Sequence, residues 1–215
     1  MWPFKKKQVP WFPAIGDFEI DESEDYLDPH HKSIINQLKS IVPPDTFRDG
    51  YICGGFASAA IGITNSYSDI DIFITNKATY RRVANILRGL PGIAFLKEIK
   101  NDRTKIRRNT LSIDVIDYSD KIDPWRLLCK PIQILENFDL NWSMACIDVG
   151  KHKIIYNIDA SSPMAMVNEN HDTNFSHQIA NRITKYQERL CAEPARAWNN
   201  QLIKALVEQK PKPIY

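Results

Sequence analysis

The chain of 215 residues is 43% hydrophobic and 10% aromatic, which is enough for a folded core in one domain with an appendage. Its 28 basic and 26 acidic residues nearly cancel, and the formal net charge of +2 excludes a strong overall attraction to nucleic acid or membrane. The four cysteines form no Cys-x-x-Cys pair, which excludes a zinc ribbon and a disulfide framework and favours reduced thiols.

Residues 1–29 predict an N-terminal arm, because proline, aromatic and acidic residues alternate there without a sustained hydrophobic period. The lysines at the start precede no apolar stretch of the kind a signal peptide needs, and no later run approaches the roughly 18 apolar residues of a membrane span. These features predict a cytoplasmic protein. The aromatic residues on either side of the lysines favour an arm that packs back onto the domain, with contact to a membrane or a partner as the alternative.

Hydrophobic periodicity predicts alternating helices and strands from residue 30 onward. Helices are expected at residues 31–42, 56–61 and 78–90, and strands at 51–53, 69–74, 94–100 and 111–118. A basic loop, residues 101–108, is expected to join the last two strands. This order predicts an α/β (α+β) fold in which helices flank a mixed sheet.

The second half of the chain predicts a short helix, a hairpin and two closing helices. The helix is expected at 132–138 after Pro131, the hairpin strands at 143–148 and 153–156, and the last helices at 175–190 and 195–208. We therefore divide the chain into the arm, a core at residues 30–160 and a helical C-terminal region at 161–215.

The main candidate site is the acid pair Asp69 and Asp71. On a strand, residues two apart point to the same face about 6.5 Å apart, so this strand presents two carboxylates side by side. A third acid, Asp114, lies in a second strand with the same pattern of acid between apolar residues. Mg²⁺ prefers such hard oxygen ligands, and pairs of ions roughly 3.5 to 4 Å apart can clamp the attacking and leaving oxygens of a displacement.

The alternative for Asp69 and Asp71 is a solvated edge strand with both acids facing water. Two glycines upstream, Gly54 and Gly55, favour a functional site instead. They allow a tight turn after a strand and a close approach to a phosphate, and the helix expected at residue 56 would direct free N–H groups to the same place.

This arrangement resembles the signature of the polymerase-β-like nucleotidyltransferase superfamily. Ile52-Cys53-Gly54-Gly55 is followed by thirteen residues and then by Asp69-Ile70-Asp71-Ile72. The resemblance implies a small mixed sheet flanked by helices, and a glycine turn that holds the triphosphate of an NTP. It also implies that Asp69 and Asp71 bind both metal ions and that Asp114 helps to activate the acceptor hydroxyl.

Two further stretches are similar to a virus- and phage-type branch of small nucleotidyltransferase-like proteins: the Phe138-Asp139 pair before a strand, and the later run Arg182-Ile-Thr-Lys185-Tyr186. The Gly-Gly turn is also similar to that of tRNA CCA-adding enzymes. However, the Arg-Asp pair of those enzymes is Ser58-Ala59 here, and their paired arginines are Glu136-Asn137. The resemblance therefore does not imply their template-like selection of CTP and ATP.

Other side chains have two interpretations each. Ser58 could meet a phosphate oxygen, or it could cap or pack the short helix. The basic loop 101–108 could contact a nucleic-acid backbone, although a solvated hairpin tip is slightly favoured because no aromatic residue is interleaved for stacking. Arg182, Lys185 and Tyr186 share one helical face, either around a single ligand or on an ordinary surface. The five histidines show no metal-ligand spacing.

The sequence thus predicts a metal-dependent nucleotidyltransferase that moves a nucleoside monophosphate from an NTP, such as ATP, to a hydroxyl and releases pyrophosphate. The expected cofactor is Mg²⁺ or Mn²⁺, and the acceptor is an RNA 3′ end, a protein or a small molecule. The predicted metal ligands are Asp69, Asp71 and Asp114, and the predicted nucleotide contacts are Gly54, Gly55, Ser58, Arg182 and Lys185. The alternative is an inactive protein that binds a nucleotide or a partner on the same fold.

Overall fold

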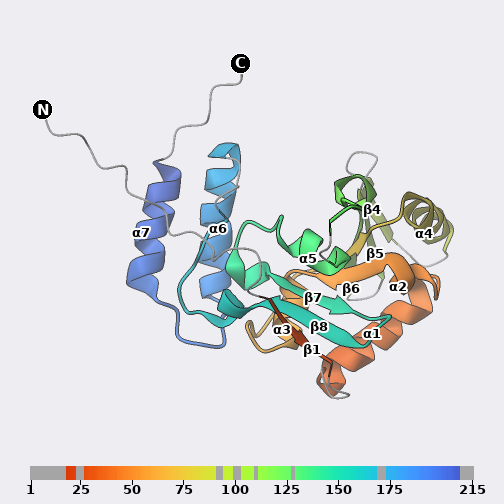
Figure 1. Ribbon diagram of the computed structural model, residues 1–215, viewed down its shortest axis with the longest axis horizontal. Coiled ribbons are helices and arrows are strands. Elements are labelled where there is room, and N and C mark those ends of the chain that lie inside the picture. The colour runs from red at the N-terminus through yellow and green to blue at the C-terminus, as the bar shows by residue number, and fades with distance from the viewer. Residues whose placement is uncertain are drawn as a thin grey trace, which may run out of the picture.

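The computed structural model describes residues 18–22, 27–90, 94–98, 103–108, 111–126, 129–168 and 173–208. In these residues an eight-stranded mixed sheet forms the centre, and two helices, α6 and α7, stand beside it (Figure 1). The strands are β1 (Phe18–Asp21), β2 (Gly50–Cys53), β3 (Ile70–Ile74), β4 (Ala94–Glu98), β5 (Arg103–Arg108), β6 (Leu111–Asp117), β7 (Ala145–Asp148) and β8 (Lys153–Asn157). The helices are α1 (Pro29–Ile41), α2 (Thr46–Asp49), α3 (Gly55–Ala60), α4 (Lys77–Gly89), α5 (Lys130–Leu135), α6 (Ser176–Gln187) and α7 (Arg196–Val207).

The sheet has the order β1-β8-β7-β2-β3-β6-β5-β4. Strands β3 and β6 run parallel, and the other neighbours are antiparallel. The mixed sheet and its flanking helices confirm the predicted fold class, and the predicted hairpin is confirmed as β7 and β8. The parallel pair requires a crossover, which α4 and the hairpin of β4 and β5 provide.

The basic segment 101–108 was wrongly expected to be a loop. Residues 103–108 form β5, which pairs with β4 on one side and with β6 on the other. Thr104 and Ile106 are fully buried, whereas Arg103 and Lys105 point to the opposite face and are only partly covered. The segment is a strand because its alternate residues fill the core.

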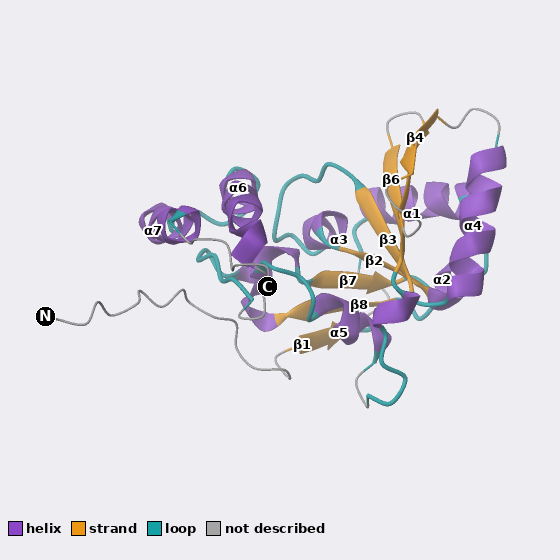
Figure 2. Ribbon diagram, turned by 90° about the horizontal axis from the view of Figure 1, so that it is seen from above, coloured by secondary structure: helices purple, strands orange, loops and turns teal. Residues whose placement is uncertain are grey.

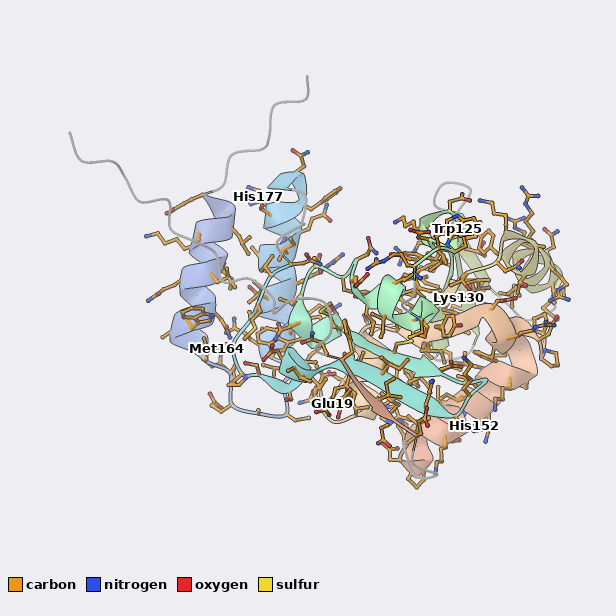
Figure 3. The ribbon with its side chains drawn as sticks, viewed as in Figure 1. Glu19, Trp125, Lys130, His152, Met164 and His177 are labelled. Atoms are coloured by element: carbon orange, nitrogen blue, oxygen red, sulfur yellow. The ribbon has the colours of Figure 1, made fainter. Side chains whose placement is uncertain are left out.

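A second strand, β1, lies within the predicted N-terminal arm. It pairs with β8 at the edge of the sheet, where Glu19 lies (Figure 3), and the Tyr156 hydroxyl donates a hydrogen bond to Glu19. Most of its side chains are exposed, which is why this strand shows no hydrophobic period. Residues 1–17, with the aromatic and lysine cluster, lie outside the described residues.

Local sequence signals explain where the two long helices of the core, α1 and α4, begin. The Asp28 carboxylate accepts a hydrogen bond from the His31 amide and caps α1, and the Asn76 side chain caps α4 in the same way. Their apolar residues pack on one face of the sheet against Ile52, Ile72 and Val115. That face is therefore closed, and Asp71 of β3 and Asp114 of β6 lie on the other one.

Helices α6 and α7 pack side by side and form a second core (Figure 2). Trp142, which is fully buried, belongs to this core and stacks on Tyr186 of α6 with ring centroids 6.2 Å apart. Its backbone carbonyl accepts a hydrogen bond of 2.7 Å from Ser58 of α3, so the residue ties the helix pair to the sheet. Among the described residues, no helix is long and apolar enough to cross a bilayer.

Candidate active site

The parallel pairing of β3 and β6 brings the three predicted acids to one place. Asp71 lies directly beside Asp114 in the register, and Asp69 immediately precedes β3. Ile70, Ile72 and Ile74 are buried on the opposite face, so Asp71 must point away from the core. Alternation on two adjacent strands is thus sufficient to assemble a carboxylate cluster.

Two cations from β5 bind these acids. Lys105, opposite Asp114 in the register, places Nζ 3.1 Å from Asp69 Oδ2 and 3.5 Å from Asp114 Oδ2. The Arg103 guanidinium donates to Asp114 Oδ2 and lies 3.7 Å from Asp71 Oδ1. Neither Arg103 nor Lys105 was predicted as a site residue, because the pattern of segment 101–108 indicated a loop.

Asp69 and Asp71 differ in the direction of their pKa shifts. Burial raises the pKa of Asp71 to about 7, and the negative charges of Asp69 and Asp114 act in the same direction, against Arg103 and Lys105. For Asp69, burial also raises the pKa, but hydrogen bonds from Ser68 and Lys105 outweigh it, and the pKa is lowered. The raised pKa of Asp71 indicates that Arg103 and Lys105 do not fully offset the negative charge and burial of the carboxylates.

The glycine turn lies next to the acids. Gly54 has φ +81°, a backbone conformation that residues with a side chain rarely adopt. Its N–H donates to the Ala145 carbonyl at 3.0 Å. A Cβ there would lie 3.4 Å from Phe138 and 3.6 Å from Asp71 Oδ2, and a Cβ on Gly55 would lie 3.6 Å from the Tyr186 hydroxyl. Both glycines therefore keep open the space between the carboxylates and α6.

Ser58 does not join this group. It is fully buried, and its hydroxyl donates to the carbonyls of Gly54 at 3.1 Å and Trp142 at 2.7 Å. It is also absent from the side chains that line the pocket above the acids. Through these two bonds Ser58 supports the glycine turn and the junction with the helix pair.

Helix α6 covers the other side of the acids. Lys185 donates to the Ser68 hydroxyl at 3.2 Å, which in turn donates to Asp69 at 2.9 Å, and Arg182 forms an ion pair with Asp139. Burial raises the pKa of Tyr186, and the charge of Asp71 adds to this effect, so the phenol lies within the field of the site. The shared helical face predicted for these residues is turned toward the acids.

A pocket of about 440 Å³ lies between β3 and α6. One wall is cationic, with Arg182, Lys185 and Arg189 from or just after α6, and another is aromatic, with Phe73, Tyr118 and Phe138. Gly54, Gly55, Asp69, Asp71 and Arg103 also line it. The sequence analysis did not single out Arg189, although its position seven residues after Arg182 places it near the same helical face.

The donor set fits a divalent cation. Asp114 Oδ1 is buried and has no hydrogen-bond partner among the described residues, and the carboxylates offer only hard oxygen ligands. As the side chains stand, no group of three or more acids, histidines or cysteines in the described part of the chain is arranged around an ion position. Arg103 and Lys105 hold the carboxylate oxygens instead.

No histidine in the described part of the chain lines the pocket at this centre. His152 lies at the turn between β7 and β8, and His177 lies on α6, far apart in the molecule (Figure 3). His31 is a buried residue in the first turn of α1, and its Nδ1 lies 2.6 Å from Asp28 Oδ2. The metal chemistry of the site would therefore rest on carboxylates.

The fold is similar to that of solved CCA-adding enzymes. A complex of such an enzyme with CTP matches with a TM-score of 0.59 and 21% identity over 89% of this chain and 47% of its own. The Thermotoga maritima CCA-adding enzyme complexed with tRNA matches with 0.55 and 21% over 89% and 46%, and a complex with ATP with 0.55 and 19% over 88% and 45%. No protein-family model and no curated protein matches the sequence.

The chain spans about half the length of these solved structures. At this identity the likeness establishes the fold alone, and it agrees with the predicted nucleotidyltransferase fold of a mixed sheet flanked by helices.

Proposed function

We propose that this chain is a metal-dependent nucleotidyltransferase that transfers a nucleoside monophosphate from an NTP to a hydroxyl acceptor. The observation that carries the proposal is the carboxylate cluster of Asp69, Asp71 and Asp114, which lies beside the glycine turn on this fold. Crowded acids destabilise a site unless a cation compensates them, and so they indicate a function that uses one.

In this proposal the carboxylates of Asp69, Asp71 and Asp114 hold Mg²⁺ or Mn²⁺. The ion supplies charge neutralisation on the triphosphate and makes the acceptor hydroxyl more acidic. The acceptor oxygen forms a new bond to the α-phosphorus, the bond from that phosphorus to the oxygen bridging to the β-phosphate breaks, and pyrophosphate leaves. Asp114, whose Oδ1 has no other partner among the described residues, accepts the hydroxyl proton.

The remaining pocket residues position the NTP. Gly54 and Gly55 leave room for the phosphates, and Arg182 and Lys185 of α6 stand across the pocket to bind their charge. Most of the rate enhancement in such a site comes from positioning and electrostatic stabilisation.

An RNA 3′ end is the acceptor that we favour, because one of the similar structures is a complex with tRNA. We do not extend templated addition of CTP and ATP to this chain, since Ser58-Ala59 and Glu136-Asn137 stand where the sequence pattern of CCA-adding enzymes has other pairs. Glu136 instead forms an ion pair with Arg126. Membership of the virus- and phage-type branch and a cytoplasmic location remain part of the proposal.

One observation favours a second candidate, an inactive nucleotide- or partner-binding protein on the same fold. Arg103 and Lys105 already neutralise the acids, so the cluster is satisfied in part without a metal. Such a protein would bind an NTP and leave its phosphates intact.

The experiment incubates the protein with each α-labelled NTP, Mg²⁺ or Mn²⁺, and separate pools of RNA, protein and small-molecule acceptors. Transfer of label to a 3′ end is the expected result, and the Asp71→Asn protein should give none. Binding of an NTP without label transfer to any pool, with metal present, would instead support the inactive candidate.

A further inference from the structure

Strand β5 supplies a pair of cations to the acids that the proposed function assigns to metal. Between them, Arg103 and Lys105 contact all three carboxylates, and both converge on Asp114 Oδ2. The side chain of Asp114 is fully buried, whereas those of Arg103 and Lys105 are 37% and 28% exposed. These are partly desolvated ion pairs, which hold their partners more firmly than pairs in open water.

The backbone fixes these cations in position. Lys105 is the direct neighbour of Asp114 in the antiparallel ladder, and Arg103 is opposite Ile116, two residues further along the same face of β6. Because β5 lies between two paired strands, its side chains cannot withdraw by a movement of the backbone. Only a rotamer change can free the carboxylate oxygens.

A divalent ion at these acids therefore competes with cations that are part of the protein. It must replace the contacts of Arg103 and Lys105 to the carboxylates, and it must also tolerate two positive charges nearby. The triphosphate of an NTP changes this balance, because its negative charges can bind both the ion and the displaced side chains.

We infer that Arg103 and Lys105 are internal counter-ions that a divalent metal must displace, so that metal binds weakly alone and more tightly together with an NTP. The inference rests on the proposed function, since it concerns the same carboxylates. It assigns positioning roles to two residues of β5 that act on the metal through Asp69, Asp71 and Asp114.

The α6 cations do not compete in this way. Lys185 contacts Ser68 and Arg182 contacts Asp139, and neither forms an ion pair with Asp69, Asp71 or Asp114. A loss of positive charge on α6 should therefore leave the affinity for metal alone nearly unchanged.

The test measures Mn²⁺ binding to the full chain, alone and with a non-hydrolysable ATP analogue. Arg103→Gln should bind Mn²⁺ alone about three- to tenfold more tightly than the unchanged protein, because the carboxylates lose a competing partner. Lys105→Gln should act in the same direction. The matched control is Arg107→Gln, on the same face of β5, where an exposed side chain makes no ion pair with the three acids. Thermal unfolding establishes that each variant is folded.

The analogue provides a second readout. In the unchanged protein it should increase the affinity for Mn²⁺, and this increase should shrink in Arg103→Gln, whose metal site is already freed. An equal or weaker affinity for Mn²⁺ alone in folded Arg103→Gln and Lys105→Gln would overturn the inference. An equal tightening in Arg107→Gln would also overturn it, because the effect would then reflect overall charge.

Asp71→Asn separates the inference from the proposed function. If the unchanged protein binds Mn²⁺ and Asp71→Asn does not, the metal site stands, and the β5 variants alone decide the inference. If no folded variant binds Mn²⁺ with or without the analogue, the metal-dependent function and the inference both fail.

Discussion

The two cationic sides of the site, β5 and α6, carry similar charges but relate to the acids in different ways. On β5, Arg103 and Lys105 bond the carboxylates directly. On α6, Lys185 reaches Asp69 only through the Ser68 hydroxyl, and Arg182 is held by Asp139. A positive residue beside a carboxylate cluster can thus have one of two roles. It can neutralise the carboxylates, as on β5, or it can remain available to bind a phosphate, as on α6.

This difference follows from the elements that carry the residues. A strand within the sheet places its side chains a fixed distance from the neighbouring strand, and so β5 must contact β6 at Asp114. A helix across the pocket leaves a gap, which here is about 440 Å³. The pocket between β3 and α6 has room for a ligand, whereas the paired strands β5 and β6 do not leave such room.

The largest effect is expected for the carboxylates that lie between β5 and α6. Asp71→Asn should reduce transfer at least about a hundredfold, because it removes a charge that positions the metal and phosphates, and Asp69→Asn should do the same. Initial rates with labelled NTP measure the loss. Asp45→Asn, at an exposed ion pair with Arg82 away from the pocket, is the control. More than a tenth of the original rate in folded Asp71→Asn would remove Asp71 from the catalytic centre.

A second prediction concerns Gly54, which keeps the pocket between the carboxylates and α6 open. Gly54→Ala forces a side chain onto φ +81° at a cost of about 1 to 3 kcal/mol, and it brings a methyl group toward Asp71 and Phe138. We expect lower stability in urea unfolding and impaired transfer. Gly62→Ala is a matched control, because Gly62 has φ +76° but open space around it. It should lose stability and keep its activity, and equal losses of activity in both variants would show that only the strain matters.

A third prediction uses pH to test the raised pKa of Asp71, the carboxylate that lies beside Arg103 of β5. The pKa of Asp71 is raised to about 7 in the folded protein and is near 3.9 in an unfolded chain. The folded state thus binds more protons between these values, and its stability falls as pH rises from about 4 to about 7. Asp71→Asn lacks this loss, and so it should gain about 1 to 3 kcal/mol over the unchanged protein as pH rises through that window.

Urea unfolding with EDTA at pH 5 and pH 8 measures this gain. Because both proteins are compared at each pH, other titrating groups cancel to first order. An identical stability difference at the two pH values would mean that Asp71 has an ordinary pKa in the folded state.

The smallest expected effect concerns the α6 side. Arg182→Ala combined with Lys185→Ala should weaken NTP binding about two- to fivefold, since the Arg182 side chain is 53% exposed and exposed charged contacts contribute little. Titration calorimetry measures the affinity, with Lys204→Ala on α7 as control. An unchanged affinity would confine the site to the sheet, whereas a loss beyond about thirtyfold would show that the bound phosphates desolvate these cations.

Much of the fold could be predicted because the central strands and long helices carry strong periods. Ile70, Ile72 and Ile74 are buried and alternate with the less buried Asp71 and Phe73 on β3, and the buried residues of α1 recur at helical spacing. Strand β5 was missed because cations occupy one whole face, and only Thr104 and Ile106 mark the other. Strand β1 pairs only with β8 and exposes most of its side chains, so its pattern is hidden.

The carboxylates of the site could be predicted because each lies in or directly before a short strand with its own local signal. Their cationic partners could not, because the contact of Lys105 with Asp114 depends on the register of an antiparallel pair. Ser58 illustrates the same limit, since its hydroxyl bonds Trp142, a residue distant in the chain. Local patterns predict side-chain direction, and non-local pairing determines what that side chain meets.

The parallel pairing of β3 and β6 also has a kinetic consequence. Asp71 and Asp114 become neighbours only after the chain between them has folded back, and such non-local pairing is slow compared with hairpin closure. Two like charges then approach each other as the ladder closes, and Arg103 and Lys105 lie on β5, the other neighbour of β6. The hairpin of β4 and β5 can form early from local contacts, and it would then bring its cations to β6 while β3 docks. The rate at which the sheet closes should therefore depend on the same two side chains that hold the acids in the finished fold.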